Sequence, residues 1–249
     1  MKRSHVAEVF GLSSATIGKI LHDVPTYTRA KIKSPDLIEN FFEDIDTEEK
    51  AYFLGLITTD GNVFEPDSMG RQASISITLQ EEDEYLLQRF KDATKTTTAI
   101  SHDGRGSAMV AIRSNIMAKD LSKYGVVPRK SFITYLPLIR EDLMPHLIRG
   151  IIDGDGSVAS LQREKHLHGI SLCGTHALVE GVLNYLLDKG IATSRVSVYD
   201  YKDKQLSQFR ISRIEDMYNV GKWLYKDATI FMQRKYEAFK DFCEHYHLD

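Results

Sequence analysis

From residue 47 onward, apolar positions recur first with helical spacing and then with strand spacing. The stretch EEKAYFLGLITTDG predicts an apolar helix, and ASISITLQ then alternates apolar and polar positions as a half-buried strand does. EDEYLLQRFKDA carries a helical stripe, and TTTAIS and SAMVAIRS flank HDGRG, which is a hairpin signal. A helix through Met117 and Leu121 and the segment VPRKSFITYLP end this half, so its predicted order is α-β-β-α-β-β-α.

The second half of the chain repeats that order. MPHLIRGIIDGDG predicts a helix, LHGISLCG a strand and ALVEGVLNYLLDKG a helix, and TSRVSVYDY and QLSQFRIS form a hairpin around KDKQ. IEDMYNVGKWLY and FMQRKYEAFKDFCEHY predict the closing helices. We therefore predict a mixed α/β fold of the α+β class, in which two pseudo-symmetric repeats, residues 47–140 and 141–249, each build one sheet about a pseudo-two-fold axis.

Residues 1–24 predict a small helical segment ahead of the repeats. The spacing of Ala7, Gly11 and Ile17 is typical of a helix-turn-helix, because a small residue, a turn glycine and a β-branched residue suit close helix packing. The residues that would then face a DNA major groove are Ser14, Thr16 and Lys19. A short helical hairpin that merely packs is the alternative.

A basic, proline-bounded stretch follows, and we expect residues 25–46 to be a linker. The side chains with which it could follow a DNA groove are Arg29, Lys31 and Lys33. A plain spacer fits the same pattern.

Charge is distributed unevenly along the chain. The 249 residues carry a formal net charge of −3, which taken alone argues against a nucleic-acid-binding protein. Residues 1–33, however, hold six basic side chains against two acidic ones, a net +4, whereas residues 36–50 hold one against seven, a net −6. A phosphate-binding face needs only local positive charge, so DNA binding stays open.

The two cysteines, Cys173 and Cys243, exclude a disulfide framework, and no apolar run approaches the ~20 residues of a membrane span. The start of the chain has a basic beginning but no long apolar region. We therefore expect a protein that is not secreted, located in the cytoplasm or in the interior of an organelle or a phage-infected host.

One apolar helix with an acidic end occurs twice, as YFLGLITTDGNV and LIRGIIDGDGSV. Gly55 and Gly150 each stand five residues before an aspartate, Asp60 or Asp155. A glycine on an apolar helix face lets another backbone come close, so we expect the two helices to pack in parallel and to bring the aspartates together. Two carboxylates at two negative helix ends repel each other unless a hard divalent cation such as Mg²⁺ lies between them.

These residues strongly resemble a known family. FLGLITTDG and IRGIIDGDG are similar to the two signature helices of a single-chain LAGLIDADG homing endonuclease, and the resemblance covers about residues 47–249. It implies a saddle of two four-stranded sheets along the DNA major groove and site-specific, Mg²⁺-dependent cleavage of both strands (Mn²⁺ or Ca²⁺ could replace Mg²⁺ in a crystal). Asp60 and Asp155 match its metal-binding acids, and the carbonyls of Thr59 and Gly154 match its backbone ligands. Two internal halves also imply a monomer.

The resemblance nominates further catalytic residues. Family members add a basic residue from each half near the closing helix, and the matching segments PRKSF and QRKYE point to Lys130 and Lys235. A solvated lysine at a helix start is the alternative. Family members also place a polar residue at the end of the second strand, where Gln80 stands, and its counterpart in the second half is roughly Cys173.

The motifs depart from the family pattern at two positions. Thr58 stands where an aspartate is usual, whereas the second motif keeps Asp153, a position that generally serves helix packing or capping. Arg149 replaces a small residue and is expected to point away from the helix pair.

DNA sequence would be read by outward-facing strand residues, because direct readout needs polar side chains at base edges. The candidates are Arg71, Ser74, Ser76, Arg113, Arg195, Lys202, Lys204 and Arg210. Tyr199 and Tyr201 could lie on the same face, and a register shift of one residue would exchange the faces.

Two other functions fit the same fold. A non-cleaving transcription regulator with a helix-turn-helix generally lacks the metal-binding acids, so Asp60 and Asp155 favour the nuclease. An intron maturase would bind RNA, which the absence of an Arg-rich tract disfavours. An intein is disfavoured because the chain ends in HLD and not in a His-Asn junction.

Overall fold

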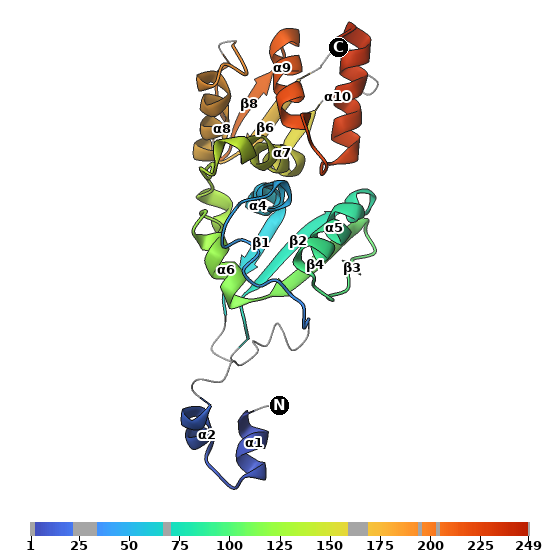
Figure 1. The fold of residues 1–249 in the computed structure, drawn as a ribbon. Coiled ribbons are helices and arrows are strands. Elements are labelled where there is room, and N and C mark those ends of the chain that lie inside the picture. Colours follow the sequence, from blue (N-terminus) through green and yellow to red (C-terminus); the bar gives the residue numbers. More distant parts are fainter. Residues whose placement is uncertain are drawn as a thin grey trace.

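The computed structural model describes residues 3–21, 34–66, 71–158, 169–193, 196–202 and 205–248. Residues 48–248 contain two halves of the order α-β-β-α-β-β-α, and each half builds one four-stranded antiparallel sheet (Figure 1). The predicted mixed α+β fold with two pseudo-symmetric repeats is therefore confirmed.

The centre of the molecule is a pair of helices, α4 (Glu48–Asp60) and α7 (Met144–Asp155), which lie side by side between the two sheets in Figure 1. Thr47 caps α4 by accepting a hydrogen bond from the Lys50 amide, and a proline lies in the first turn of α7. Residues 51–58 of α4 and 147–153 of α7 are all buried. Each helix is enclosed on all sides because it packs on its own sheet and on the other helix.

The first sheet has the strand order β1-β2-β4-β3 and the second has the order β5-β6-β8-β7. The strands of the first sheet are β1 (Gly61–Phe64), β2 (Ser74–Gln80), β3 (Ser101–His102) and β4 (Ser107–Arg113). Those of the second sheet are β5 (Gly156–Val158), β6 (Ile170–Gly174), β7 (Tyr199–Asp200) and β8 (Ser207–Ile211). Gly61 pairs with Ile77 in the first sheet, and Gly156 pairs with Leu172 in the second. Each residue of the second pair lies 95 positions after its counterpart in the first pair, so the two sheets have the same register.

The remaining helices cover one face of each sheet. They are α5 (Glu84–Thr94), α6 (Asn115–Ser122), α8 (His176–Asp188), α9 (Ile214–Tyr225) and α10 (Gln233–Tyr246), with the 3₁₀ turns η1 (Glu81–Asp83), η2 (Lys130–Phe132) and η3 (Glu141–Leu143). Ile75, Ile77 and Leu79 point into this core from β2, while Thr78 and Gln80 are exposed on the opposite face. Period-two alternation thus leaves each sheet one open, outer face.

The edge strands β3 and β7 are shorter than the strands predicted for the two hairpins. Of the segment TTTAIS only Ser101 pairs with β4, and the following residue His102 completes β3. Thr96 and Thr98 bond to each other, and the Ser34 hydroxyl bonds to Thr97, so these polar side chains hold the preceding residues outside the ladder.

Residues 34–46 belong to the first half, which corrects the linker predicted for residues 25–46. Leu37, Phe41, Phe42 and Ile45 are buried in the same hydrophobic core as α4 and α5. The rings of Phe42 and Phe90 stack at 6.5 Å. Most of the acidic side chains between these apolar positions stay at the surface, although Glu39 is buried.

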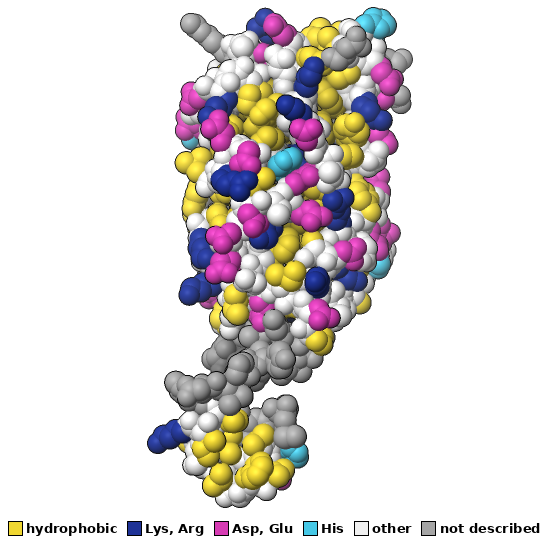
Figure 2. All heavy atoms as spheres, in the orientation of Figure 1, with side chains coloured by type: hydrophobic (Ala, Val, Ile, Leu, Met, Phe, Trp, Pro, Cys, Tyr) yellow, Lys and Arg dark blue, Asp and Glu magenta, His cyan; other side chains and the backbone are white. Residues whose placement is uncertain are grey.

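Two short helices precede this body, α1 (Arg3–Val9) and α2 (Ser14–Ile20). Gly11 has φ +61° at the turn between them, and Ser13 caps α2 through the Thr16 amide. Figure 2 shows apolar side chains gathering on this unit, where Val9, Phe10 and Ile20 are exposed. Among the described residues, no helix is long and apolar enough to cross a membrane.

Candidate active site

The C-terminal ends of α4 and α7 meet because two glycines remove the side chains that would separate them. A Cβ on Gly55 would clash with the Leu147 carbonyl and lie 2.9 Å from Ile151 N, and one on Gly150 would clash with the Tyr52 carbonyl. Gly154 packs against side chains of α4, since a Cβ there would clash with the Thr59 hydroxyl and lie 3.1 Å from Asp60 Oδ2. The contacts of Gly55 and Gly150 are to backbone, so the helix axes are closer than side chains would permit.

This approach brings Asp60 and Asp155 into electrostatic contact. Loss of hydration and then the Asp155 charge raise the pKa of Asp60 from 3.8 to about 6. Loss of hydration also raises the pKa of Asp155, and the charges of Lys130 and Lys235 oppose that rise. Asp60 is half-buried and Asp155 is the more exposed of the two. The pair is therefore a locus of concentrated negative charge that can accept a cation.

Lys130 and Lys235 lie at this site as buried side chains, 6% and 5% exposed, and not as solvated ones. Lys130 Nζ donates to the carbonyls of Thr58 at 2.8 Å and Thr59 at 3.1 Å. Burial lowers the pKa of Lys130, and it lowers that of Lys235 to about 8. Each ammonium thus stabilises the negative end of one motif helix beside the carboxylates.

The two predicted backbone ligands differ in their surroundings. The Thr59 carbonyl already accepts a hydrogen bond from Lys130. Lys235 Nζ donates to the carbonyls of Ile152 at 2.7 Å, Asp153 at 2.6 Å and Gly156 at 2.7 Å, a set that does not include Gly154. The halves are therefore not chemically equivalent at the positions expected to bind a cation.

Asp153 acts as a structural acid behind the site. Its Oδ2 accepts hydrogen bonds from the Tyr52 hydroxyl at 2.8 Å and from the Met232 amide at 2.7 Å, just before α10 begins. Burial raises its pKa, and its Oδ1 has no hydrogen-bond partner among the described residues. Thr58, at the matching place in α4, bonds the Leu54 carbonyl of its own helix. This agrees with a packing and capping role for the inner motif acid.

Arg149 links the halves on the other side of the helix pair. It is fully buried, and its guanidinium donates to the carbonyls of Ile230 at 2.8 Å and Leu224 at 2.5 Å. It also donates to Glu48 Oε1 at 2.7 Å, and Glu48 accepts from Thr229 as well. The arginine therefore turns toward the segment that precedes α10 and ties it to the start of α4.

The donor chemistry fits a hard divalent cation. Among the described residues no group of three or more His, Cys, Asp and Glu side chains forms a ready metal site. The candidate ligands are Asp60 and Asp155, whose charges interact, with the neighbouring carbonyls, and all of these are oxygen donors. Soft-metal sites built from cysteine or histidine need a different set.

Gln80 ends β2, exposed on the outer face. β2 extends beyond the Gly61–Ile77 pair, so Gln80 lies on the part of the strand that runs past the start of β1. The matched registers correct its expected counterpart, because Cys173 corresponds to Thr78, and Thr175 corresponds to Gln80. The expected counterpart differs by two residues, because β6 ends at Gly174, one position before the residue that matches Gln80.

The candidate DNA contacts fall into three groups. Exposed residues are Ser14, Thr16, Lys19, Arg71, Arg113, Lys202 and Arg210, and Ser74 is half-buried. Ser76 is on the outer face by register but only 7% exposed, so its hydroxyl is not an open contact. The candidates outside the described residues are Arg29, Lys31, Lys33, Arg195 and Lys204.

One outer-face residue was missed by the sequence analysis. Gln208 lies two residues before Arg210 on β8 and shares its face. The signal was present, because period-two alternation that selects Arg210 selects Gln208 as well.

Comparison with solved structures finds a similar fold in LAGLIDADG meganucleases. The LAGLIDADG meganuclease I-AabMI bound to uncleaved DNA superposes with a TM-score of 0.54 at 17% identity, over 79% of this chain and 90% of that one. I-SmaMI bound to uncleaved DNA with calcium ions gives 0.55 at 13% identity, over 82% and 94%. I-SmaMI bound to cleaved DNA gives 0.52 at 14% identity, over 81% and 89%.

No protein-family model matches the chain, and no curated protein matches it. At these identities the structural similarity establishes the fold: this chain has the two-motif, single-chain LAGLIDADG homing endonuclease fold.

Proposed function

We propose that this protein is a site-specific endonuclease that hydrolyses both strands of double-stranded DNA with divalent metal ions held by Asp60 and Asp155. One observation carries the proposal: the two acids, 95 residues apart in sequence, meet at the ends of helices packed backbone to backbone. The solved structures of this fold that bind uncleaved and cleaved DNA support the same activity.

The chain's own residues would prepare the site for a phosphodiester. Asp60 and Asp155 would supply carboxylate oxygens, and the carbonyls of Thr59 and Gly154 are the proposed backbone ligands. Lys130 and Lys235 hold positive charge beside these acids, where it can stabilise charge that develops on the phosphate. A bound divalent cation would supply Lewis acidity and lower the pKa of a bound water. Mg²⁺ is the expected ion, given the oxygen donors.

The outer faces of the two sheets are the proposed DNA-binding surface. They carry polar residues such as Ser74, Thr78 and Arg113 on the first sheet and Arg210 on the second. Residues 1–24 are proposed to act as a helix-turn-helix that extends this footprint. Two halves within one chain present two such surfaces together, so we propose that the protein acts as a monomer.

The activity is tested on a plasmid library of candidate target sites, with Mg²⁺ or with EDTA. We expect linear product only with Mg²⁺ and none from Asp155→Asn. Asp142→Asn is the matched control, because Asp142 is an exposed carboxylate, paired with Arg140, in the turn η3 that precedes the start of α7, whereas Asp155 ends that helix. Metal-independent binding with no cleavage under either condition would contradict the nuclease and indicate the regulator.

A further inference from the structure

One row of residues across the outer face differs between the two sheets. In the first sheet the row is Thr78, Met109 and Ser101, joined by strand pairing. The residues that match it in the second sheet are Cys173, Gln208 and Tyr199. An apolar methionine in one half therefore corresponds to an amide in the other, so the row cannot treat two DNA half-sites alike.

The Gln208 amide is held in one orientation. The Tyr201 hydroxyl donates to Gln208 Oε1 at 2.6 Å, and the Tyr201 ring meets the Tyr199 ring edge-on at 5.0 Å. Tyr201 is itself half-buried, which limits its rotation. The phenol occupies one of the two acceptor positions of Oε1, so the two N–H donors of the NH₂ group are the more available part of the amide.

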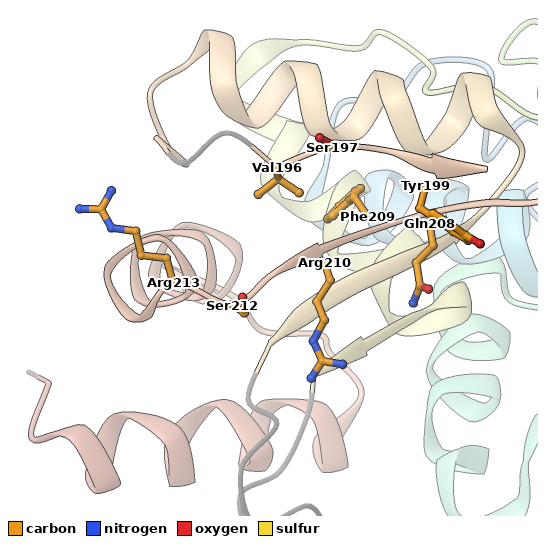
Figure 3. A pocket seen from close by; sticks show the side chains of 8 residues that line it. All are labelled: Val196, Ser197, Tyr199, Gln208, Phe209, Arg210, Ser212 and Arg213. Carbon is orange, nitrogen blue, oxygen red and sulfur yellow. The ribbon is translucent and has the colours of Figure 1, made fainter. Parts of the chain in front are cut away.

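Gln208 borders an open hollow of about 430 Å³ at the edge of the second sheet (Figure 3). β7 pairs with β8 only at Tyr199 and Asp200, and the preceding residues leave the ladder, which opens this space beside β8. Figure 3 shows Arg213 turned away from the hollow, and it is paired with Glu215 at 2.5 Å. The polar side chains at the hollow's outer side come from β7 and β8.

An amide that offers mainly its N–H donors favours the base edge with the most acceptors. Glutamine with both amide atoms available reads adenine, which offers one acceptor and one donor in the major groove. Guanine offers two neighbouring acceptors, N7 and O6, and no donor on that edge. We propose that Gln208, positioned by Tyr201, is a specificity-determining residue that selects guanine over adenine at one base pair of the half-site bound by the second sheet. This inference rests on the proposed DNA-binding function.

The test is a selection of randomised duplex DNA by the full chain in EDTA, followed by sequencing of the bound fraction. We expect one position where guanine exceeds adenine by about tenfold or more, as a well-placed base contact gives. Gln208→Ala should remove that preference and leave the other selected positions unchanged. Tyr201→Phe should admit adenine there, because it frees Oε1, while affinity for the best site changes less than about threefold.

Met109→Ala is the matched control, since Met109 holds the corresponding place in the first sheet. It should leave the Gln208-dependent position unchanged. Retention of the preference in Gln208→Ala, in a protein that still selects the rest of its site, would overturn the inference alone. Selection of no sequence by the unmodified chain would overturn both the inference and the proposed function. Selected binding without Mg²⁺-dependent cleavage would remove the nuclease and leave the inference standing.

Discussion

Replacing Gly55 by alanine tests whether backbone contact between α4 and α7 holds the molecule together. The added Cβ would clash with the Leu147 carbonyl and lie 2.9 Å from Ile151 N and 3.1 Å from Gly150 Cα. All three neighbours are backbone atoms of a buried helix, so no side chain can rotate to make room. The substitution must push the helix axes apart.

The magnitude follows from two opposing effects. Overpacking a core typically costs about 1–3 kcal/mol, and the rigid neighbours place this case near about 3 kcal/mol. Alanine in place of glycine inside a helix returns about 1 kcal/mol. The net loss is about 2 kcal/mol, which lowers the melting temperature of a chain of this size by about 4–8 °C.

Thermal melting followed by circular dichroism measures this change, with Gly181→Ala as the control. Gly181 lies inside α8, which has 13 residues as α4 does, and its added Cβ would meet only Leu136, with Cβ at 3.1 Å and N at 3.8 Å. That loop residue can shift by a few tenths of an ångström, so the control should stay within about 1 kcal/mol of the unmodified protein. A Gly55→Ala protein that melts no lower than Gly181→Ala would refute the backbone-contact argument.

Three other perturbations probe the same framework. Arg149→Met should lower the free energy of unfolding by about 3–5 kcal/mol in urea titrations, because Glu48 and two carbonyls lose a buried partner. The control Arg213→Met removes an exposed ion pair and should change the free energy of unfolding by less than about 1 kcal/mol. Similar unfolding midpoints for the two variants would contradict this. Because the pKa of Asp60 is about 6 in the folded chain and 3.8 when unfolded, its carboxyl group loses its proton at lower pH in the unfolded chain. The free energy of unfolding therefore falls as pH rises from 3.8 to about 6. In EDTA at pH 7, Asp60→Asn should therefore raise the free energy of unfolding by up to about 3 kcal/mol, seen as a higher melting temperature, and it should have little effect at pH 3.5. An equal effect at both pH values would count against the carboxylate pair. Deleting residues 1–33 should weaken DNA binding more than it slows cleavage of saturated DNA, and an unchanged dissociation constant would exclude the α1–α2 unit from the footprint.

The sequence predicts the helix pair well because its determinants are local. Gly55, Gly150 and the two aspartates lie within single helical segments, and 95-residue spacing identifies them without any knowledge of packing. Whether the side chains of Lys130 and Lys235 point to solvent or into the protein could not be predicted, because a lysine at a turn can do either. Only the folded chain shows that each ammonium group donates hydrogen bonds to carbonyls at the end of a motif helix.

Residues 34–46 illustrate a signal that was present and outweighed. Leu37, Ile38, Phe41, Phe42 and Ile45 recur at helix-like spacing, yet the basic, proline-bounded stretch before them led to the prediction of a linker over residues 25–46. The structure buries the apolar positions against Phe90 and keeps most of the acids outside. Tertiary partners decided the outcome, and those partners lie some 50 residues further along the chain.

The departure of the first motif from the second has a structural reason. Asp153 holds the Met232 amide at the start of α10, and α10 carries Lys235 to the carbonyl end of α7. The first half has no such helix at the matching place: Lys130 stands in the short turn η2, and the chain then runs extended toward α7. A carboxylate at position 58 would therefore be buried without a helix start to cap, which costs more than it contributes. Threonine satisfies its hydroxyl on the Leu54 carbonyl of its own helix, so the first motif tolerates the loss of the acid that the second motif needs.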